Sequence, residues 1–181
     1  MPLLDVLNSE SKMRWPQRVT TARAEAFRRA LTRGLPLFLI TLSVIGLDQL
    51  SKHLIRANME MGQSIPRECI VGFHYTTNTG GAFGLFANQT FLLTMAAVIG
   101  IAVLVLYLRY LPLRSTLLKV GLGLDLGGAI GNLIDRLCFG RVTDFIDIGA
   151  WPVFNVADSG IVVGTFLIAF YLLFATRKRA R

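Results

Sequence analysis

Val120–Leu137, with the sequence VGLGLDLGGAIGNLIDRL, is the stretch that decides the fold. It is apolar over a length close to the roughly 20 residues that a helix needs to cross a bilayer. Its only ionisable groups are Asp125, Asp135 and Arg136. Three other runs share this character: Leu35–Ile55, Phe91–Leu108 and Val156–Thr176. The four runs together predict an all-α membrane protein with four transmembrane helices.

The composition of the 181-residue chain supports this class. Hydrophobic residues make up 53% of the chain and charged residues 17%, whereas soluble domains average about 25% charged residues. These values exclude an ordinary soluble domain, a disulfide scaffold and a disordered chain as descriptions of the whole, and no nucleic-acid partner is expected. The net charge of +8 instead carries information about topology.

Fourteen of the nineteen Lys and Arg residues lie in three segments that the four-helix arrangement places on one side of the membrane: the N-terminal segment, the loop after Leu108 and the tail. The positive-inside rule then puts both termini in the cytoplasm. We expect a basic cytoplasmic extension at 1–34, a transmembrane domain at 35–176 and a basic tail at 177–181. The extension is either a helix on an anionic lipid surface or a solvated tail.

The two loops on the opposite side differ in length. In the first, about 56–90, glycines separate aromatic and β-branched residues such as Ile70, Phe73 and Tyr75, which favours a small extracytoplasmic β-cradle of short strands and turns. The second carries Trp151, a residue typical of the membrane interface. Cys69 and Cys138 lie in or beside these loops, and we expect two free, packed cysteines.

Polar residues inside apolar runs are expensive to bury in lipid and point to function. Asp48 and Lys52 share a helix face at i, i+4 spacing, and an internal ion pair is the favoured interpretation over direct chemistry. Asn132, Asp135 and Arg136 share a face of the third helix in the same way. The glycines four residues apart on that helix allow a neighbouring helix to approach closely; they are Gly123, Gly127 and Gly131.

Asp144 and Asp158 are candidates for paired acid–base chemistry. The third helix leaves and the fourth enters the membrane on one face, so the two carboxylates can meet there. Two carboxylates near a shared water hold one proton between them, as in aspartic proteases. The spacing alone leaves open the alternative that Asp144 caps a turn and Asp158 complements a helix dipole.

Five stretches of the chain, in this order, resemble the sequence boxes of lipoprotein signal peptidase, also called signal peptidase II. They are Asp48–Lys52 (DQLSK), Asn78–Gly84 (NTGGAFG), Gly127–Arg136 (GGAIGNLIDR), Val142–Phe145 (VTDF) and Phe154–Asp158 (FNVAD). Five ordered boxes over about 110 residues are far more specific than one box alone. The resemblance implies an aspartyl endopeptidase of the bacterial inner membrane. It would cleave signal peptides from diacylglyceryl-modified prolipoproteins on the amino side of the lipidated cysteine, near the outer face, as a monomer among membrane lipids, without metal or cofactor.

The resemblance also assigns roles to residues. Asp144 and Asp158 match the catalytic dyad. Substrate-binding or dyad-orienting positions match Asn78, Asn132, Arg136 and Asn155, and supporting polar positions match Asp48, Lys52 and Asp135. The sequence departs from the family in its long basic start, in the short stretch between the dyad residues, and at Asp125, where an apolar residue is usual and where no partner for the acid is evident.

Two other classes of membrane protein share parts of this pattern. Gly121-Leu-Gly123-Leu-Asp125 resembles the Gly-x-Gly-Asp box of presenilin-like proteases, but an extra residue separates the second glycine from the acid and the sequence shows no partner Tyr-Asp box. A small four-helix ion-coupled transporter would also place acids inside helices. It would not require two acids together at one interface beside a structured outer loop.

Overall fold

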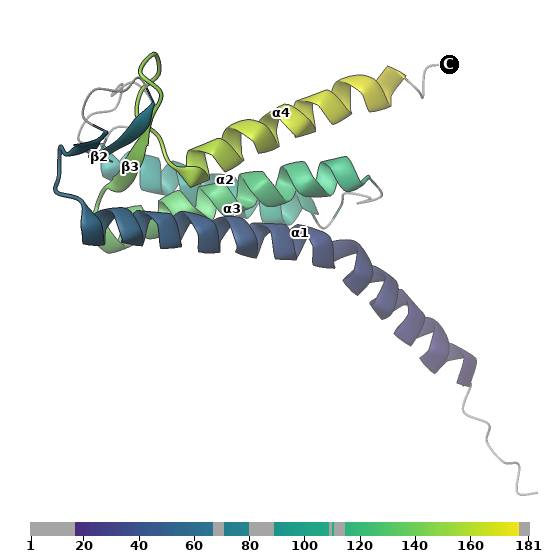
Figure 1. The fold of residues 1–181 in the computed structure, drawn as a ribbon. Coiled ribbons are helices and arrows are strands. Elements are labelled where there is room, and N and C mark those ends of the chain that lie inside the picture. Colours follow the sequence, from purple (N-terminus) through teal and green to yellow (C-terminus); the bar gives the residue numbers. More distant parts are fainter. Residues whose placement is uncertain (1–16, 67–70, 80–88, 109, 111–114, 178–181) are drawn as a thin grey trace, which may run out of the picture. The chain divides into compact units, whose positions relative to one another are not determined.

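The structure, a computed structural model, describes residues 17–66, 71–79, 89–108, 110 and 115–177. The chain divides into two compact units, Met1–Thr32 and Arg33–Arg181, and the second unit holds every candidate site residue. Its elements are drawn in Figure 1. In chain order they are α1 (Gln17–Asn58, which begins in the first unit), β1 (Ser64–Ile65), β2 (Gly72–Asn78), α2 (Thr90–Leu108), α3 (Thr116–Phe139), β3 (Val142–Asp147) and α4 (Val156–Arg177).

Three helical segments among the described residues are long and apolar enough to cross a membrane: Gly34–Asn58, Thr116–Phe139 and Val156–Phe174. They correspond to three of the four predicted spans. The remaining predicted span, Phe91–Leu108, forms α2 as expected. Its apolar part, Thr90–Leu106, is shorter than the other three.

The interior of the second unit contains many polar side chains beside a small apolar cluster, and much of its exterior is apolar. The largest fully buried side chains are Lys52, Asn155, Asp48, Asp135 and Asp144. Large apolar side chains on all four helices are exposed. Such an arrangement suits a lipid solvent, because a polar group inside the membrane needs a protein partner whereas an apolar one does not.

Small residues on α3 let two helices pack closely against it. The three glycines that the sequence singled out face α1: a Cβ on Gly127 would lie 2.7 Å from Val44 Cβ, and one on Gly123 would lie 2.9 Å from a methyl carbon of Ile40. Gly128, on another face of α3, lies directly against the backbone of Ala157 in α4. The predicted close helix approach is therefore confirmed, and α1 is the neighbour.

The sheet has three antiparallel strands in the order β1-β2-β3. β1 and β2 lie in the segment between α1 and α2, where short strands were predicted. β3 comes from the segment between α3 and α4, and this strand was not predicted. In the register of β2 with β3, Thr76 lies opposite Asp144. The sheet thereby joins these two segments beside the start of α4 (Figure 1).

A tight turn connects α3 to β3. Gly140 follows the helix with φ 70°, and its N–H donates to the carbonyl of Arg136 at 3.1 Å. Glycine adopts this left-handed conformation without steric cost, which makes it the common residue at a helix C-terminus. Because the turn is short, Asp144 follows closely after the polar face of α3.

Candidate active site

The N-terminus of α4 is built around Asn155 and Asp158. The backbone N–H of Asp158 donates to Asn155 Oδ1 at 2.9 Å, and the backbone N–H of Asn155 donates to Asp158 Oδ2 at 3.3 Å. This reciprocal pair is a capping box, here with aspartate in the place usually taken by glutamate. It fixes the Asp158 carboxylate at the first turn of the helix, so the predicted helix-terminal position of Asp158 is confirmed.

Asn155 also reaches the other carboxylate. Its side-chain Nδ2 donates to Asp144 Oδ1 at 2.6 Å, while its Oδ1 accepts from the backbone of Asp158. The residue is fully buried. One residue therefore contacts both acids that the sequence paired: its side chain donates to the Asp144 carboxylate and its backbone N–H donates to the Asp158 carboxylate.

Backbone pairing brings Asn155 to Asp144. The N–H of Ile146 donates to the carbonyl of Phe154 at 2.7 Å, and the N–H of Phe154 donates to the carbonyl of Ile146 at 3.1 Å. The chain thus turns back along β3 just before α4 begins. The alternative that Asp144 caps a turn is wrong, because Asp144 lies within β3.

The environment of Asp144 favours its protonated form. Burial and, after it, the nearby Asp158 charge raise the pKa of this carboxyl from 3.8 to about 7, although the amides of Asn155 and Asn78 and the charge of Lys52 act to lower it. A buried acid close to a second carboxylate behaves in this way because two like charges cannot both ionise cheaply. The site can therefore hold a proton on Asp144 near neutral pH.

Asn132 connects the dyad to a buried ion pair on α1. Its Nδ2 donates to Asp158 Oδ1 at 2.7 Å, and its Oδ1 accepts from Lys52 Nζ at 3.0 Å. Lys52 Nζ also lies 2.8 Å from Asp48 Oδ2. The predicted pair between Asp48 and Lys52 is confirmed. The lysine further fixes the orientation of the Asn132 amide group, because only the amide oxygen can accept a hydrogen bond from the lysine.

Asp48 and Asp135 tie the ion pair to neighbouring elements. Asp48 Oδ1 accepts from the backbone N–H of Ala157 at 2.9 Å, which anchors the start of α4. Asp135 Oδ2 accepts from the backbone N–H of Thr143 at 2.9 Å and lies 3.4 Å from Lys52 Nζ. These supporting acids thus hold α4 and β3, the elements that carry the dyad.

Sequence reasoning missed three residues of this network. Gln49 Nε2 donates to Asp48 Oδ2 at 3.1 Å and to Asp135 Oδ1 at 3.3 Å. Arg56 Nη1 donates to Thr143 Oγ1 at 2.9 Å and lies 3.5 Å from Asp135 Oδ1. The i, i+4 series from Asp48 through Lys52 to Arg56 was a signal for the arginine. Gln49 and Thr143 stood inside the quoted boxes.

A cavity of about 420 Å³ opens beside Asp158. Its polar wall contains Asn78, Asn132, Arg136 and Asp158, and its apolar wall includes Trp151. The Arg136 guanidinium interacts electrostatically with both dyad acids. Asp144 is almost fully buried and is not part of the cavity wall.

The nine residues predicted for the site occupy one continuous region. The dyad, Asn155 and Asn132 form its centre, Asn78 and Arg136 line the cavity, and Asp48, Lys52 and Asp135 support it from α1 and α3. In the described part of the chain, no group of three or more His, Cys, Asp or Glu side chains is arranged to hold a metal ion.

Two other sequence expectations changed. Asp125 has a partner, since its Oδ1 accepts from Thr165 Oγ1 at 3.1 Å. Cys138 is free but exposed, so the expectation that it packs in the interior is wrong. It lies on the last turn of α3, where the neighbouring side chains of Leu137 and Phe139 are also exposed. Cys69 lies outside the described residues.

Comparisons with known proteins agree on one family. A family model described as signal peptidase (SPase) II matches residues 40–174. The lipoprotein signal peptidase of Moorella thermoacetica is 44% identical over 151 residues, which cover 81% of this chain and 99% of that protein. The lipoprotein signal peptidase of Bacillus subtilis is 42% identical over 153 residues, which cover 80% of this chain and 97% of the relative.

Solved structures share the fold. One structure of a bacterial membrane enzyme superposes with a TM-score of 0.68 at 32% sequence identity, covering 77% of this chain and 88% of the other. A second bacterial membrane enzyme gives a TM-score of 0.65 at 29% identity, covering 76% and 92%.

Proposed function

The chain belongs to the signal peptidase II family, and on this premise we propose that it is an aspartic endopeptidase whose catalytic groups are Asp144 and Asp158. The family makes it a multi-pass bacterial membrane peptidase that acts in lipoprotein processing. The observation that carries the proposed chemistry is Asn155, whose side-chain amide donates to the Asp144 carboxylate and whose backbone N–H donates to the Asp158 carboxylate. No structural need explains two acids held by one asparagine as directly as shared proton chemistry does.

The contacts of the two acids indicate that one is protonated and the other is ionised. Asp144 holds the proton, since its pKa is raised to about 7. Both oxygens of Asp158 accept from N–H groups, as a carboxylate does. Asp158 takes a proton from water as the water oxygen bonds to the scissile carbonyl carbon, and Asp144 donates its proton to the carbonyl oxygen.

Collapse of the resulting tetrahedral species breaks the carbon–nitrogen bond. The proton held by Asp158 passes to the leaving amine, and the hydroxyl proton returns to Asp144 as the carboxylic acid product forms. Arg136, beside both acids, and Asn78, in the wall of the cavity, are placed to hold the peptide backbone. Asn132 and Asn155 orient the dyad.

The proposed substrate is a diacylglyceryl-modified prolipoprotein, cleaved on the amino side of the lipidated cysteine. Acyl chains in the bilayer set the depth of the scissile bond, because each buried methylene contributes about 0.8 kcal/mol. In the proposed topology α2 crosses the membrane together with the three longer helices, which gives four transmembrane helices. The positive-inside rule then puts both termini in the cytoplasm and the dyad near the outer face. Water and the translocated cleavage site both reach it there.

Cleavage by the purified chain in detergent tests this function. A diacylglyceryl-modified precursor should lose its signal peptide and shift on a gel. The same precursor without the lipid, or with serine in place of the cysteine, should be cut poorly. Equal cleavage of lipidated and unlipidated precursors would contradict the proposed role of the lipid.

A further inference from the structure

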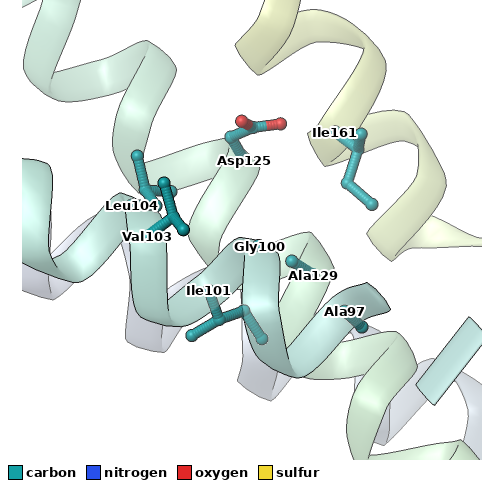
Figure 2. Close-up of a pocket in the computed structure, with 8 residues that line it drawn as sticks. All are labelled: Ala97, Gly100, Ile101, Val103, Leu104, Asp125, Ala129 and Ile161. Carbon is teal, nitrogen blue, oxygen red and sulfur yellow. The ribbon is translucent and has the colours of Figure 1, made fainter. Parts of the chain in front are cut away.

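A second cavity lies deeper in the helical unit. It measures about 340 Å³ and is lined by residues of α2, α3 and α4, as Figure 2 shows. Ala97, Ala129 and Ile161 line both this cavity and the one beside Asp158. The two cavities therefore adjoin each other along these three residues.

Asp125 is the one charged residue among the described residues that line this cavity. Its carboxyl group is seen among the otherwise apolar lining in Figure 2. Oδ1 accepts from Thr165 Oγ1, and no described residue donates a hydrogen bond to Oδ2. The acid is only partly buried. One carboxyl oxygen is thus left for a ligand in the cavity.

The distance between Asp125 and the dyad region along α3 indicates which part of the substrate that ligand belongs to. Asp125 and Asn132 lie about two turns apart on α3, or about 10 Å along the helix axis. A substrate chain covers this distance in about three residues when extended and about seven when helical. The carboxyl therefore faces the apolar segment of the signal peptide, some three to seven residues before the scissile bond.

We propose that Asp125 and the cavity around it form a specificity subsite for a hydroxyl side chain, serine or threonine, in the apolar segment of the signal peptide. This inference rests on the proposed function. A helical backbone satisfies its own polar groups, so the donor to Oδ2 must be a side chain. A lysine would need a desolvated ion pair, which costs more than a neutral hydrogen bond. An acyl chain would leave the carboxyl without a donor.

Cleavage rates of matched precursors test the subsite. In diacylglyceryl-modified precursors with an otherwise apolar segment, serine is compared with alanine at each position from three to seven before the scissile bond. For the wild-type chain, kcat/KM should favour serine by roughly 3- to 10-fold at one position or two neighbouring positions, the range expected for one net hydrogen bond. Asp125→Leu should abolish the preference, while Asp125→Asn, which keeps an acceptor oxygen, should retain part of it.

The outcomes separate the two proposals. If the wild-type chain cleaves none of the lipidated precursors, the proposed function fails. If it cleaves them all with no preference for serine at any position, the proposed function stands and the subsite is refuted. This result needs only the wild-type chain, so it holds even if Asp125→Leu does not fold. If Asp125→Leu raises kcat/KM equally for every precursor, the cavity holds an apolar group such as an acyl chain, and the proposed hydroxyl subsite is also refuted.

Discussion

Replacing Lys52 by methionine should destabilise the protein strongly. The lysine is fully buried and its Nζ lies 2.8 Å from Asp48 Oδ2 and 3.4 Å from Asp135 Oδ2, with both acids also fully buried. Its loss leaves two buried carboxylates with one remaining cation, Arg56, at 3.5 Å from Asp135. Breaking a buried ion pair from one side costs about 3–5 kcal/mol, and we expect a loss of that size in the free energy of unfolding.

A double variant isolates the electrostatic cause. Asp48→Asn with Lys52→Met removes one charge of each sign and leaves Asp135 paired with Arg56. The asparagine oxygen can still accept from the backbone of Ala157, as Asp48 does. Most of the stability lost in the single variant should therefore return. Activity should remain low, because in both variants Asn132 Oδ1 has lost the charged Lys52 donor and keeps only Asn155 Nδ2 at 3.2 Å.

Unfolding in mixed detergent micelles, followed by circular dichroism as the denaturing detergent is increased, measures these differences. Lys119→Met is the matched control, since no acidic side chain among the described residues pairs with Lys119. A Lys52→Met protein as stable as this control would refute the buried ion pair. A double variant less stable than the single variant would refute the charge-balance reasoning.

Three further predictions concern the dyad and its position. Because Asp144 has a pKa of about 7 and supplies a proton, kcat/KM should fall as the pH rises through about 7, and Asn78→Ala should move this limb to higher pH by removing a contact that lowers the pKa. The folded chain holds that proton where the unfolded chain releases it, so stability should also fall between about pH 4 and 7. A kcat/KM that does not fall above about pH 7 would contradict the first statement, and a stability that is constant from about pH 4 to 7 would contradict the second. Asn155→Ser keeps a helix N-cap but not the buried amide that donates to Asp144, so activity should drop at least about 10-fold. Loss of the buried hydrogen bonds should lower the free energy of unfolding by about 1–3 kcal/mol, and unchanged activity would remove Asn155 from the site. In a variant without native cysteines, a cysteine at Ala150 should react with an impermeant maleimide on intact spheroplasts and one at Ser115 only after lysis, and the reverse pattern would overturn the topology.

The helices and the polar cluster could be predicted because their signals are local. Apolar length alone located the helices, and i, i+4 spacing paired Asp48 with Lys52. The glycines four apart on α3 revealed a close helix contact but not its partner. That partner depends on which helix packs against this face of α3, and helix packing is a property of the folded structure.

The features that sequence reasoning missed depend on contacts between distant segments. β3 pairs with β2 from another loop, and a six-residue strand at a helix end has no periodicity long enough to distinguish it from a turn. Thr165 lies on a different helix from Asp125, so no local spacing connects them. The prediction for Cys138 was wrong because free cysteines are usually buried, whereas its exposure depends on which face of α3 the neighbouring elements cover.

The measurement that tests the proposed mechanism most directly is cleavage of a diacylglyceryl-modified precursor by purified Asp144→Asn and Asp158→Asn variants. Product formation is followed by mass spectrometry, and the fold of each variant is checked by circular dichroism and gel filtration. An amide keeps the size of each side chain but cannot exchange the proton. Each folded variant should therefore yield no detectable N-terminal lipidated cysteine under conditions in which the wild-type chain converts the precursor fully. Wild-type activity in either folded variant would remove that residue from the chemistry and contradict the shared-proton mechanism.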